Sequence, residues 1–321
     1  MSSSDGLSVR GLATRWGDRP VLEDVSFHIR PGEFVSLMGP NGSGKTTLLR
    51  AIAGFEPIVA GTVEVDGRPV HTLPAHRRRV GLLFQEPTML PGRTVRENVA
   101  YGAELQRRAP GEVDRTVGDL LERLHLTELS DRRAEALSGG ERHRVALART
   151  LAAEPAVVLL DEPFASVDPE LRAELRAEFR AVLGSRAAPV LHVTHDREEG
   201  LFLGDRVMLL SEGRLVQSGP PNEVAESPAT REVARFLGYN LVEVEGRTLA
   251  VRPEALEVGR LSSAGLLGRV VAAGRVGSVH IVYLRGDRGE RWESRGPAVG
   301  ALPAVGDRVG VRWTQSVPLD R

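Results

Sequence analysis

The stretch that decides the fold is Phe34-Val35-Ser36-Leu37-Met38 followed by Gly39-Pro40-Asn41-Gly42-Ser43-Gly44-Lys45-Thr46. Its first part is a short apolar run typical of a buried strand, and its second part fits the pattern G-x-x-x-x-G-K-[ST]. The glycines allow consecutive backbone N–H groups to curl around phosphate oxygens, Lys45 adds a positive charge, and the Thr46 hydroxyl is a ligand for Mg²⁺. The stretch therefore predicts a phosphate site between a strand and a helix. The alternative is a glycine-rich turn with an incidental lysine.

On both sides of this stretch, from residue 7 to about residue 237, short apolar strands alternate with amphipathic helices. Residues 157–160, 190–193 and 206–210 read as further strands. Residues 169–183 read as a helix, because proline stands at its start and apolar residues follow at helical spacing. The apolar positions of that helix are Leu171, Leu175, Phe179, Val182 and Leu183. The pattern predicts an α/β domain with a largely buried sheet.

After about residue 239 the sequence changes to short runs in which apolar and polar residues alternate, separated by glycine turns. Examples are residues 241–244, 279–283 and 309–311. This pattern predicts a small β-rich domain. The expected organisation is one domain over residues 1–238 and a second over residues 239–321.

The composition narrows the class of partner. Lysine plus arginine (42) nearly balances aspartate plus glutamate (43), so the net charge of -1 gives no pull toward nucleic acid, and none is expected as a partner. The absence of cysteine suits a reducing compartment, and no apolar run reaches the roughly 18 residues that a spanning helix needs. Membrane attachment is therefore expected through partners. The cluster Arg77-Arg78-Arg79 is expected to be solvated surface.

Two carboxylates, Asp161 and Glu162, directly follow the predicted strand at residues 157–160. If this strand neighbours the strand of the phosphate loop, both carboxylates emerge at the edge where the phosphates bind. Asp161 is then expected to hold Mg²⁺ through water, and Glu162 to orient or deprotonate the attacking water. An isolated Asp-Glu pair otherwise serves as an acidic cap for the segment that follows.

His195 and Gln85 also stand at the ends of predicted strands. His195 is placed to reach the terminal phosphate from the same edge. Asp196 and Glu199 have the spacing of a capping box, which gives the neighbourhood of His195 a purely structural alternative. Gln85 taken alone is a strand-end amide.

The segment Leu137-Ser138-Gly139-Gly140-Glu141 opens a predicted helix that runs to about residue 153. Ser138 and Glu141 have capping-box spacing, but capping does not explain the two glycines, which allow a backbone to approach an anion at the positive end of a helix dipole. A second anion site in one domain indicates a ligand shared between two copies.

The order of these motifs resembles the ABC-transporter ATPase family over essentially the whole chain. The resemblance implies an α/β P-loop NTPase domain with a helical subdomain, and it implies ATP and Mg²⁺ as ligands. In that family's terms Gln85 is the Q-loop glutamine, Asp161 and Glu162 the Walker B pair, Asp168 the D-loop aspartate and His195 the switch histidine. It implies Glu162, His195 and Gln85 in catalysis, and Thr46, Gln85 and Asp161 at the metal. The implied nucleotide-binding residues are Trp16, Gly39, Pro40, Asn41, Gly42, Ser43, Gly44, Lys45, Thr46, Thr47, Ser138, Gly139, Gly140, Glu141 and Asp168.

Three positions depart from the commonest family pattern. Glu141 stands where glutamine is usual, Val167 where leucine is usual, and Trp16, similar to the aromatic that stacks on adenine, where tyrosine or phenylalanine is more frequent. None of the three departures removes a catalytic group.

The family mechanism implied is a head-to-tail homodimer in which each ATP lies between Lys45 of one copy and Ser138 and Gly140 of the other. Binding closes the pair and hydrolysis opens it. The resemblance also implies integral-membrane permease subunits, an extracytoplasmic solute-binding protein that acts indirectly, and a peripheral position on the cytoplasmic face of the membrane. The permease contact is expected beside Gln85, in residues 88–101, where Thr94 and Glu97 have capping-box spacing.

The tail carries Arg252-Pro253-Glu254 within its β-rich segment, and it resembles the OB-like TOBE domain found after the ATPase in many bacterial importers. This implies solute uptake, with an inorganic ion such as ferric iron or a molybdate/sulfate-type oxyanion as the first expectation. A polyamine or a sugar is the alternative cargo. The rival functions are a non-transport ABC ATPase and a regulatory module whose ATPase is vestigial.

Overall fold

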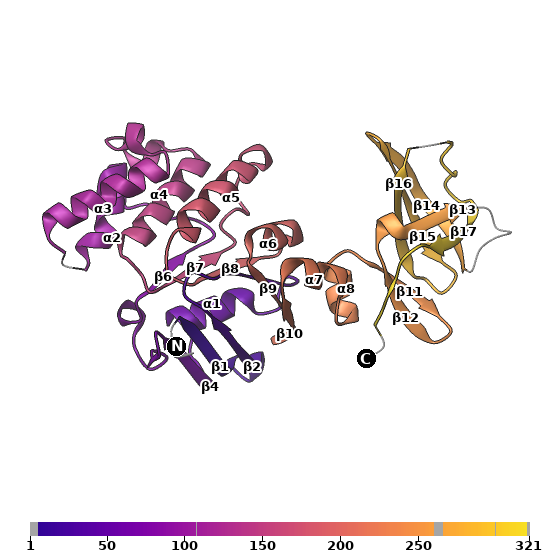
Figure 1. Ribbon diagram of the computed structural model, residues 1–321, viewed down its shortest axis with the longest axis horizontal. Coiled ribbons are helices and arrows are strands. Elements are labelled where there is room, and N and C mark those ends of the chain that lie inside the picture. The colour runs from indigo at the N-terminus through magenta and orange to yellow at the C-terminus, as the bar shows by residue number, and fades with distance from the viewer. Residues whose placement is uncertain (1–5, 107, 260–265, 299, 320–321) are drawn as a thin grey trace. The chain divides into compact units, whose positions relative to one another are not determined.

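The computed structural model describes residues 6–106, 108–259, 266–298 and 300–319 (Figure 1). Contacts divide the chain into two compact units, residues 1–221 and 222–321. The domain boundary predicted from the sequence, near residue 238, lies C-terminal to this division. The reason is that α8 (Arg231–Phe236) and nearly all of α7 (Pro221–Glu226) belong by their contacts to the second unit.

A six-stranded sheet lies at the centre of the first unit, with strand order β10-β9-β3-β8-β7-β6. The strands are β3 (Phe34–Met38), β6 (Val80–Leu83), β7 (Val157–Asp161), β8 (Val190–Thr194), β9 (Arg206–Ser211) and β10 (Arg214–Gly219). All neighbours are parallel except β9 and β10. The condition that β3 and β7 be neighbours is not met, because β8 lies between them.

Both faces of this sheet are covered, as an unbroken apolar run predicts for a buried strand. On β7, Val157 and Leu159 pack into one core with α1 (Lys45–Ala53), whereas Val158 and Leu160 point to the opposite face and pack with α5 (Pro169–Gly184). The first core also receives a four-stranded sheet of order β2-β1-β4-β5. Its strands are β1 (Leu7–Trp16), β2 (Arg19–Ile29), β4 (Ala60–Val65) and β5 (Arg68–Pro69).

The helical part of this unit contains α2 (Val95–Glu104), α3 (Pro110–Arg123) and α4 (Gly139–Ala152), which pack on one another (Figure 1). Two of them begin with the capping boxes that the sequence predicts, Thr94 with Glu97 and Ser138 with Glu141. The short 3-10 turns of the unit are η1 (Ala75–Arg77), η2 (Thr127–Leu129) and η3 (Ala134–Ala136). None of the helices in the described ranges combines the length and the apolar composition that spanning a bilayer requires.

Helix α5 begins at Pro169, as predicted, and α6 (Arg197–Leu203) follows β8. Four members of the predicted apolar face of α5 are buried, but Leu171 is 44% exposed. Leu171 lies in the first turn, ahead of the core that Leu175 and Phe179 enter, so helical spacing alone misplaced it.

The expectation that Arg77-Arg78-Arg79 is solvated is wrong at Arg78, which is buried. Its guanidinium donates to the carbonyls of Ala51 and Ile52, in the last turn of α1, and to those of His71 and Leu73. Carbonyls in the last turn of a helix have no partner within the helix, so Arg78 satisfies groups that would otherwise be buried without a hydrogen bond.

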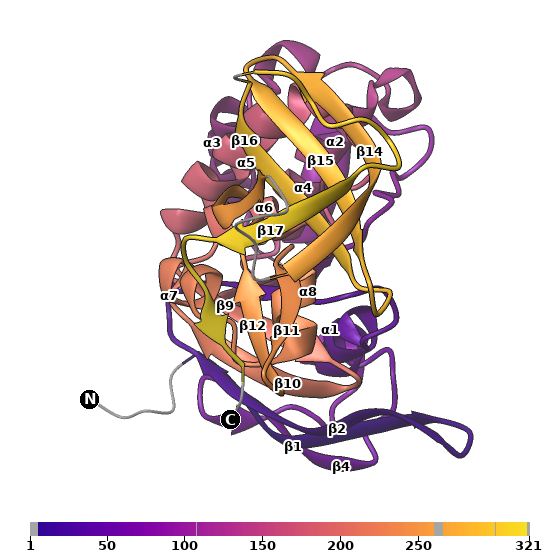
Figure 2. The same cartoon turned by 90° about the vertical axis from the view of Figure 1, so that its right-hand side faces the viewer.

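The second unit is mainly antiparallel β-structure, visible face-on in Figure 2. A small sheet holds β11 (Asn240–Val244), β12 (Arg247–Val251) and β18 (Val317–Pro318). A five-stranded sheet of order β13-β17-β14-β15-β16 holds β13 (Leu256–Gly259), β14 (Leu266–Val276), β15 (Val279–Gly286), β16 (Arg291–Pro297) and β17 (Arg308–Trp313). The Arg-Pro-Glu motif leads into the turn η4 (Pro253–Ala255), between β12 and β13.

Candidate functional site

The phosphate loop lies between β3 and α1, where the sequence predicts it. A Cβ atom at Gly39 would lie 2.1 Å from the carbonyl oxygen of Leu210, and Gly44 has a φ of 102°, so both positions require glycine. The buried hydroxyl of Ser43 has no hydrogen-bond partner in the described structure. A buried polar atom without a partner fits a site that a phosphate oxygen completes.

Lys45 is buried at the start of α1, and its Nζ donates to the carbonyls of Gly39 and Pro40, both at 2.9 Å. Burial lowers the pKa of Lys45, while the charges of Glu162 and Asp161 oppose this shift. Lys45 is also the only lysine of the sequence, which otherwise uses arginine. A compact ammonium suits this loop better than a forked guanidinium, and this compositional signal adds to the motif.

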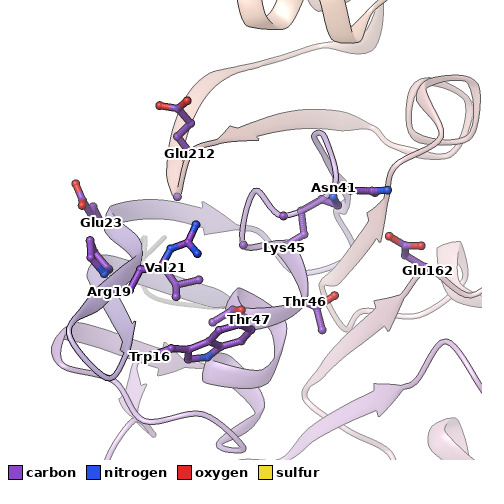
Figure 3. A pocket seen from close by; sticks show the side chains of 14 residues that line it. Trp16, Arg19, Val21, Glu23, Asn41, Lys45, Thr46, Thr47, Glu162 and Glu212 are labelled. Carbon is purple, nitrogen blue, oxygen red and sulfur yellow. The ribbon is translucent and has the colours of Figure 1, made fainter.

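A cavity of about 810 Å³ opens over the loop (Figure 3). The predicted aromatic Trp16, at the end of β1, lines it and is 61% exposed, so its ring is free to stack on a planar ligand. Seven more predicted residues border the cavity, including Glu162 from β7's edge. They are Asn41, Gly42, Gly44, Lys45, Thr46, Thr47 and Glu162.

The side chains of Thr46 and Asp161 are in contact, although β3, which leads into the phosphate loop, and β7 are not neighbours in the sheet. The Thr46 hydroxyl donates to Asp161 Oδ1 at 3.0 Å. Burial raises the pKa of Asp161, the Thr46 hydrogen bond opposes the shift, and the charge of Glu162 adds to it. A hydroxyl and a carboxylate side by side are hard oxygen ligands of the kind that Mg²⁺ prefers, so the pair fits this ion.

Glu162 and His195 form a pair at the same sheet edge, with His195 Nδ1 at 2.8 Å from Glu162 Oε2. Glu162 has a φ of 45°, an uncommon backbone conformation for a side-chain-bearing residue, and its N–H donates to the carbonyl of Val193 on β8. This strand-to-strand bond holds the carboxylate at the mouth of the cavity (Figure 3). The pair combines a proton acceptor with an imidazole able to orient it.

Gln85 and Asp168 lie outside the residues that line the cavity in the described structure. Leu83 of β6 pairs with Leu160 of β7, so Gln85, which is exposed, leaves the sheet at the edge that carries Glu162. Asp168 caps α5, and its Oδ1 accepts the N–H of Glu170 at 3.0 Å.

The segment of residues 137–141 forms the start of α4 and likewise does not reach the cavity of its own chain. Ser138 Oγ accepts the N–H of Glu141, and Glu141 Oε2 accepts the N–H of Ser138 at 2.6 Å. No atom lies within 4 Å of a Cβ placed on Gly139, so the backbone here faces open space. This helix start is therefore accessible to a ligand presented from outside the chain.

Asp196 caps α6 as predicted, but Glu199 does not complete a capping box. Asp196 Oδ1 accepts the N–H groups of Glu198 and Glu199, whereas the Glu199 side chain turns to His192 and Arg176. Of the capping box proposed as the structural alternative, the structure therefore contains the Asp196 cap but not the return hydrogen bond to Glu199.

Several cavity residues carry no motif and escaped the sequence reasoning. Arg19, Glu23 and Glu212 bring charges to the lining of the cavity (Figure 3). Gly213 donates its N–H to the Ser43 carbonyl at 3.1 Å, and a Cβ there would lie 2.3 Å from the carbonyl oxygen of Val21. The only sequence signal here was the Glu212-Gly213 pair, which is typical of a tight turn with a positive φ at the glycine.

Comparison with known proteins gives two family matches, ABC transporter over residues 22–165 and TOBE domain over residues 249–317. The ferric-ion import ATP-binding protein FbpC of Streptomyces coelicolor is 40% identical, and the alignment covers 96% of this chain and 94% of that protein. The spermidine/putrescine import ATP-binding protein PotA of Oleidesulfovibrio alaskensis is 41% identical over 72% of this chain and 62% of its own length. The sulfate/thiosulfate import ATP-binding protein CysA of Bordetella parapertussis is 46% identical over 72% and 67%.

Solved structures of ABC proteins also share the fold, and two of them serve as examples. CbiO1 of Clostridium perfringens, part of an ABC transporter complex, gives a TM-score of 0.65 at 28% identity over 72% of this chain and 94% of that one. The ATP-binding cassette MJ0796, solved as a dimer in a post-hydrolysis state with ADP and Pi, gives a TM-score of 0.59 at 28% identity over 67% and 98%.

Proposed function

The chain belongs to the ABC transporter family, among import ATP-binding subunits that carry a TOBE domain, and from this premise we propose that it powers the uptake of ferric iron or a sulfate-type oxyanion. It is an ATPase that uses Mg²⁺. The observation that carries the choice of cargo is the ferric-ion import relative, because that match includes the C-terminal unit and nearly the whole of both chains.

The nucleotide is proposed to occupy the cavity of Figure 3, with Trp16 against the base and the loop amides around the phosphates. Lys45 then exchanges its two loop carbonyls for phosphate oxygens, and the unpartnered Ser43 hydroxyl gains an acceptor. Gly39, Pro40, Asn41, Gly42, Gly44 and Thr47 complete this set of binding residues.

Thr46, Asp161 and Gln85 are proposed to hold Mg²⁺, whose chemistry is to neutralise charge on the phosphates. Glu162 orients or deprotonates the attacking water, and its strained backbone fixes the carboxylate at the sheet edge. His195 holds Glu162 through Nδ1 and approaches the terminal phosphate from β8.

Importers of this family work as dimers with membrane permeases. We propose a head-to-tail pair, because the start of α4 is exposed and does not line the cavity of its own chain. Ser138, Gly139, Gly140, Glu141 and Asp168 of one copy would then complete the cavity of its twin. ATP would bind the closed pair more tightly than the open pair and would therefore favour closure. The closing movement would then drive the conformational change of the permease.

The permease contact is proposed beside Gln85. Phe55 and Phe84 are exposed by 58% and 41%, and their ring centroids lie 6.1 Å apart, so they form an exposed aromatic pair next to the Q-loop. Residues 88–101, which include the start of α2, adjoin this pair in sequence. The chain would thereby sit on the cytoplasmic face of the membrane, with a solute-binding protein on the far side.

Uptake by cells that lack this chain tests the cargo. Radioactive ferric iron, sulfate and spermidine are supplied in turn, and the wild-type chain or its Glu162→Gln variant is restored. We expect iron or sulfate uptake to return with the wild-type chain alone. Restoration of spermidine uptake only would support the polyamine alternative, and co-purification with nucleic acid rather than a permease would support a non-transport ATPase.

A further inference from the structure

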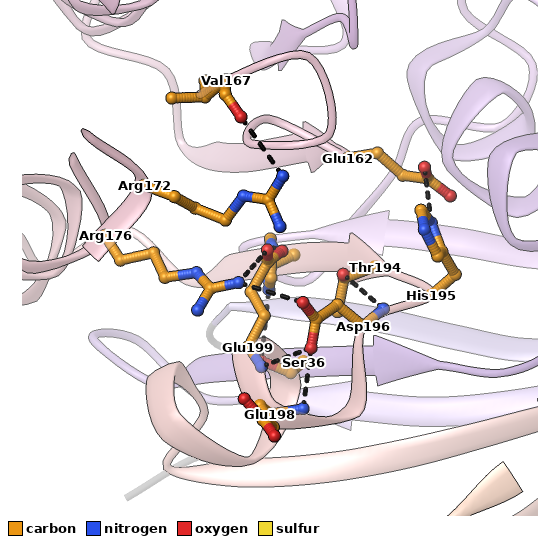
Figure 4. Close-up of polar contacts among 11 residues, drawn as sticks. Ser36, Glu162, Val167, Arg172, Arg176, Thr194, His195, Asp196, Glu198 and Glu199 are labelled. Atoms are coloured by element: carbon orange, nitrogen blue, oxygen red, sulfur yellow. Dashed lines mark hydrogen bonds and ion pairs between the residues drawn. The ribbon is translucent and has the colours of Figure 1, made fainter. Parts of the chain in front are cut away.

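Outside the cavity, a buried polar network joins α5 to β8 and α6 (Figure 4). Arg176 on α5 donates from Nη2 to Asp196 Oδ2 at 3.2 Å and to Glu199 Oε2 at 3.0 Å. The other oxygen of Glu199 lies 2.8 Å from Nε2 of His192. The side chains of Arg176 and Glu199 are 15% and 5% exposed, so little solvent screens this ion pair, and breaking it leaves a buried charge without a partner.

One end of the network reaches the residue next to the switch histidine. Asp196 uses one oxygen to cap α6 and the other to accept from Arg176. Its own N–H donates to Thr194 Oγ1 at 3.0 Å. Because Asp196 directly follows His195 in the chain, the position of the guanidinium fixes the backbone that carries the imidazole, and the imidazole contacts Glu162.

The other end belongs to the helix of the D-loop. Arg176 lies about two turns beyond Asp168, the capping residue of α5. Nearer the start of that helix, Arg172 Nη2 donates to the carbonyl of Val167 at 3.2 Å, which ties the D-loop backbone to α5. The D-loop, α5 and Arg176 therefore form one connected element.

The centre of the network extends to the strand of the phosphate loop. His192 is fully buried on β8, and its Nδ1 lies 3.3 Å from Oγ of Ser36 on β3. Burial raises the pKa of Glu199, but its contacts with His192, Thr194 and Arg176 outweigh burial and leave that pKa below its ordinary value. Glu199 is thus an ionised group held between the sheet and α5.

We propose that Arg176 is a positioning residue that couples the D-loop to His195. A contact of the D-loop with the second copy would move α5, and Arg176 would pass that movement through Asp196 and Glu199 to the imidazole that holds Glu162. The idea rests on the proposed function, because it needs a site completed by a twin. Loss of Arg176 leaves two carboxylates facing each other at the start of α6, and a small displacement of His195 is expected to slow hydrolysis roughly ten- to hundredfold.

The first experiment compares kcat, the KM for ATP and the melting temperature among variants. We expect Arg176→Met to lower kcat while KM changes by about twofold at most, since the network does not line the cavity. The double variant Arg176→Met/Glu199→Gln also removes the buried carboxylate that loses its partner. It is therefore expected to fold even if the single variant is unstable. Its kcat is expected to stay as low as that of the single variant. Arg180→Gln is the matched control, because Arg180 lies one turn further on α5 and pairs with the exposed Asp205. Folded Arg176 variants with wild-type kcat would overturn the proposal.

The second experiment is a double-mutant cycle in single-turnover assays. If Arg176 acts through His195, Arg176→Met adds no loss in the background of His195→Ala. Independent losses that multiply would show a merely structural role and overturn the proposal. If the wild-type protein hydrolysed no ATP, both this proposal and the proposed function would fail, whereas normal wild-type hydrolysis with multiplying losses would reject the coupling alone.

Discussion

Helices α1 and α4 both have a glycine at or just before their first residue and are both proposed to meet the same triphosphate, yet their first turns differ. Helix α1 has Gly44 as its N-cap residue, which provides no side-chain cap, and buried Lys45 adds a positive charge. Helix α4 begins with a closed capping box in which the Glu141 carboxylate already occupies the Ser138 N–H. The first helix start has no side-chain cap and carries a cation, whereas the second offers accessible glycine backbone beside a negative charge.

This difference indicates which helix start binds ATP first. An uncapped helix start with a cation attracts a phosphate on its own, because the dipole and the charge act together. A start neutralised by its own carboxylate adds useful contacts only when a second copy delivers it to a nucleotide that is already bound. The roles are therefore expected to be binding at α1 and closure at α4.

The largest effect is expected at α1. Lys45→Ala removes the only cation of the loop, so ATP binding weakens and hydrolysis falls on the order of a hundredfold or more. Lys45→Arg is expected to rescue little of the rate, because a forked guanidinium does not reproduce a compact ammonium in this buried position. Phosphate release and calorimetric ATP titration measure both effects. A Lys45→Ala enzyme with half of the wild-type rate would contradict the assignment.

At α4, Ser138→Ala is expected to spare ATP binding to the monomer and to abolish ATP-driven pairing. Loss of the cap costs about 1 kcal/mol of stability. Thr94→Ala is the matched control, because it removes an equivalent capping box on α2. Light scattering with and without ATP should show pairing lost in the first variant and kept in the second. Equal pairing in both would remove the distinction between the two helix starts.

A smaller effect of opposite sign is expected for Glu141→Gln. The amide keeps the hydrogen bond to Ser138 N–H but removes the charge, so an approaching triphosphate is repelled less. The change corresponds to about 0.3–1 kcal/mol, or roughly a two- to fivefold lower ATP concentration for half-maximal pairing. The measurement uses a Glu162→Gln background, in which hydrolysis does not open the pair. A higher ATP requirement would contradict the electrostatic argument.

The smallest effect is a pair of opposite pH dependences in the nucleotide-free protein. Because burial raises the pKa of Asp161, the folded state keeps a proton that the unfolded chain has released, and stability falls as pH rises from the ordinary aspartate pKa through the raised one. Because the Ser138 N–H lowers the pKa of Glu141, its contribution is present above the ordinary glutamate pKa and is lost as pH falls through the lowered one.

Melting curves of two variants test these signs. Asp161→Asn is expected to raise the melting temperature by a few degrees at neutral pH and to have no effect below the ordinary aspartate pKa. Glu141→Gln is expected to lower it slightly at neutral pH and not in acid. Shifts of the same sign at neutral pH would contradict the contrast between the two regions.

Local signals in the sequence predicted the parts of the fold that depend on near neighbours in the chain. The strand that ends at Met38, the proline start of α5 and the capping boxes at Thr94 and Ser138 are examples. These features follow from burial, fixed φ and hydrogen bonds within one turn, so periodicity and spacing suffice to find them.

Features that depend on distant segments escaped prediction. No spacing indicates that β8 separates β3 from β7, or that Arg78 reaches back to the last turn of α1. Likewise, Glu212 lines the cavity because β9 runs beside β3 and the turn from β9 to β10 carries Glu212 there. Sheet order decides the first and the third, and the Arg78 contact depends on packing between segments far apart in the chain, so all three are tertiary properties.

A complementation assay tests the shared site most directly. In a head-to-tail pair, Lys45→Ala mixed with Ser138→Ala creates one cavity with both defects and one with an intact Lys45 and an intact Ser138. The account predicts that the mixture hydrolyses ATP well above the average of the two variants assayed separately. Activity equal to that average would contradict it, because a site built within one chain cannot be restored by a partner.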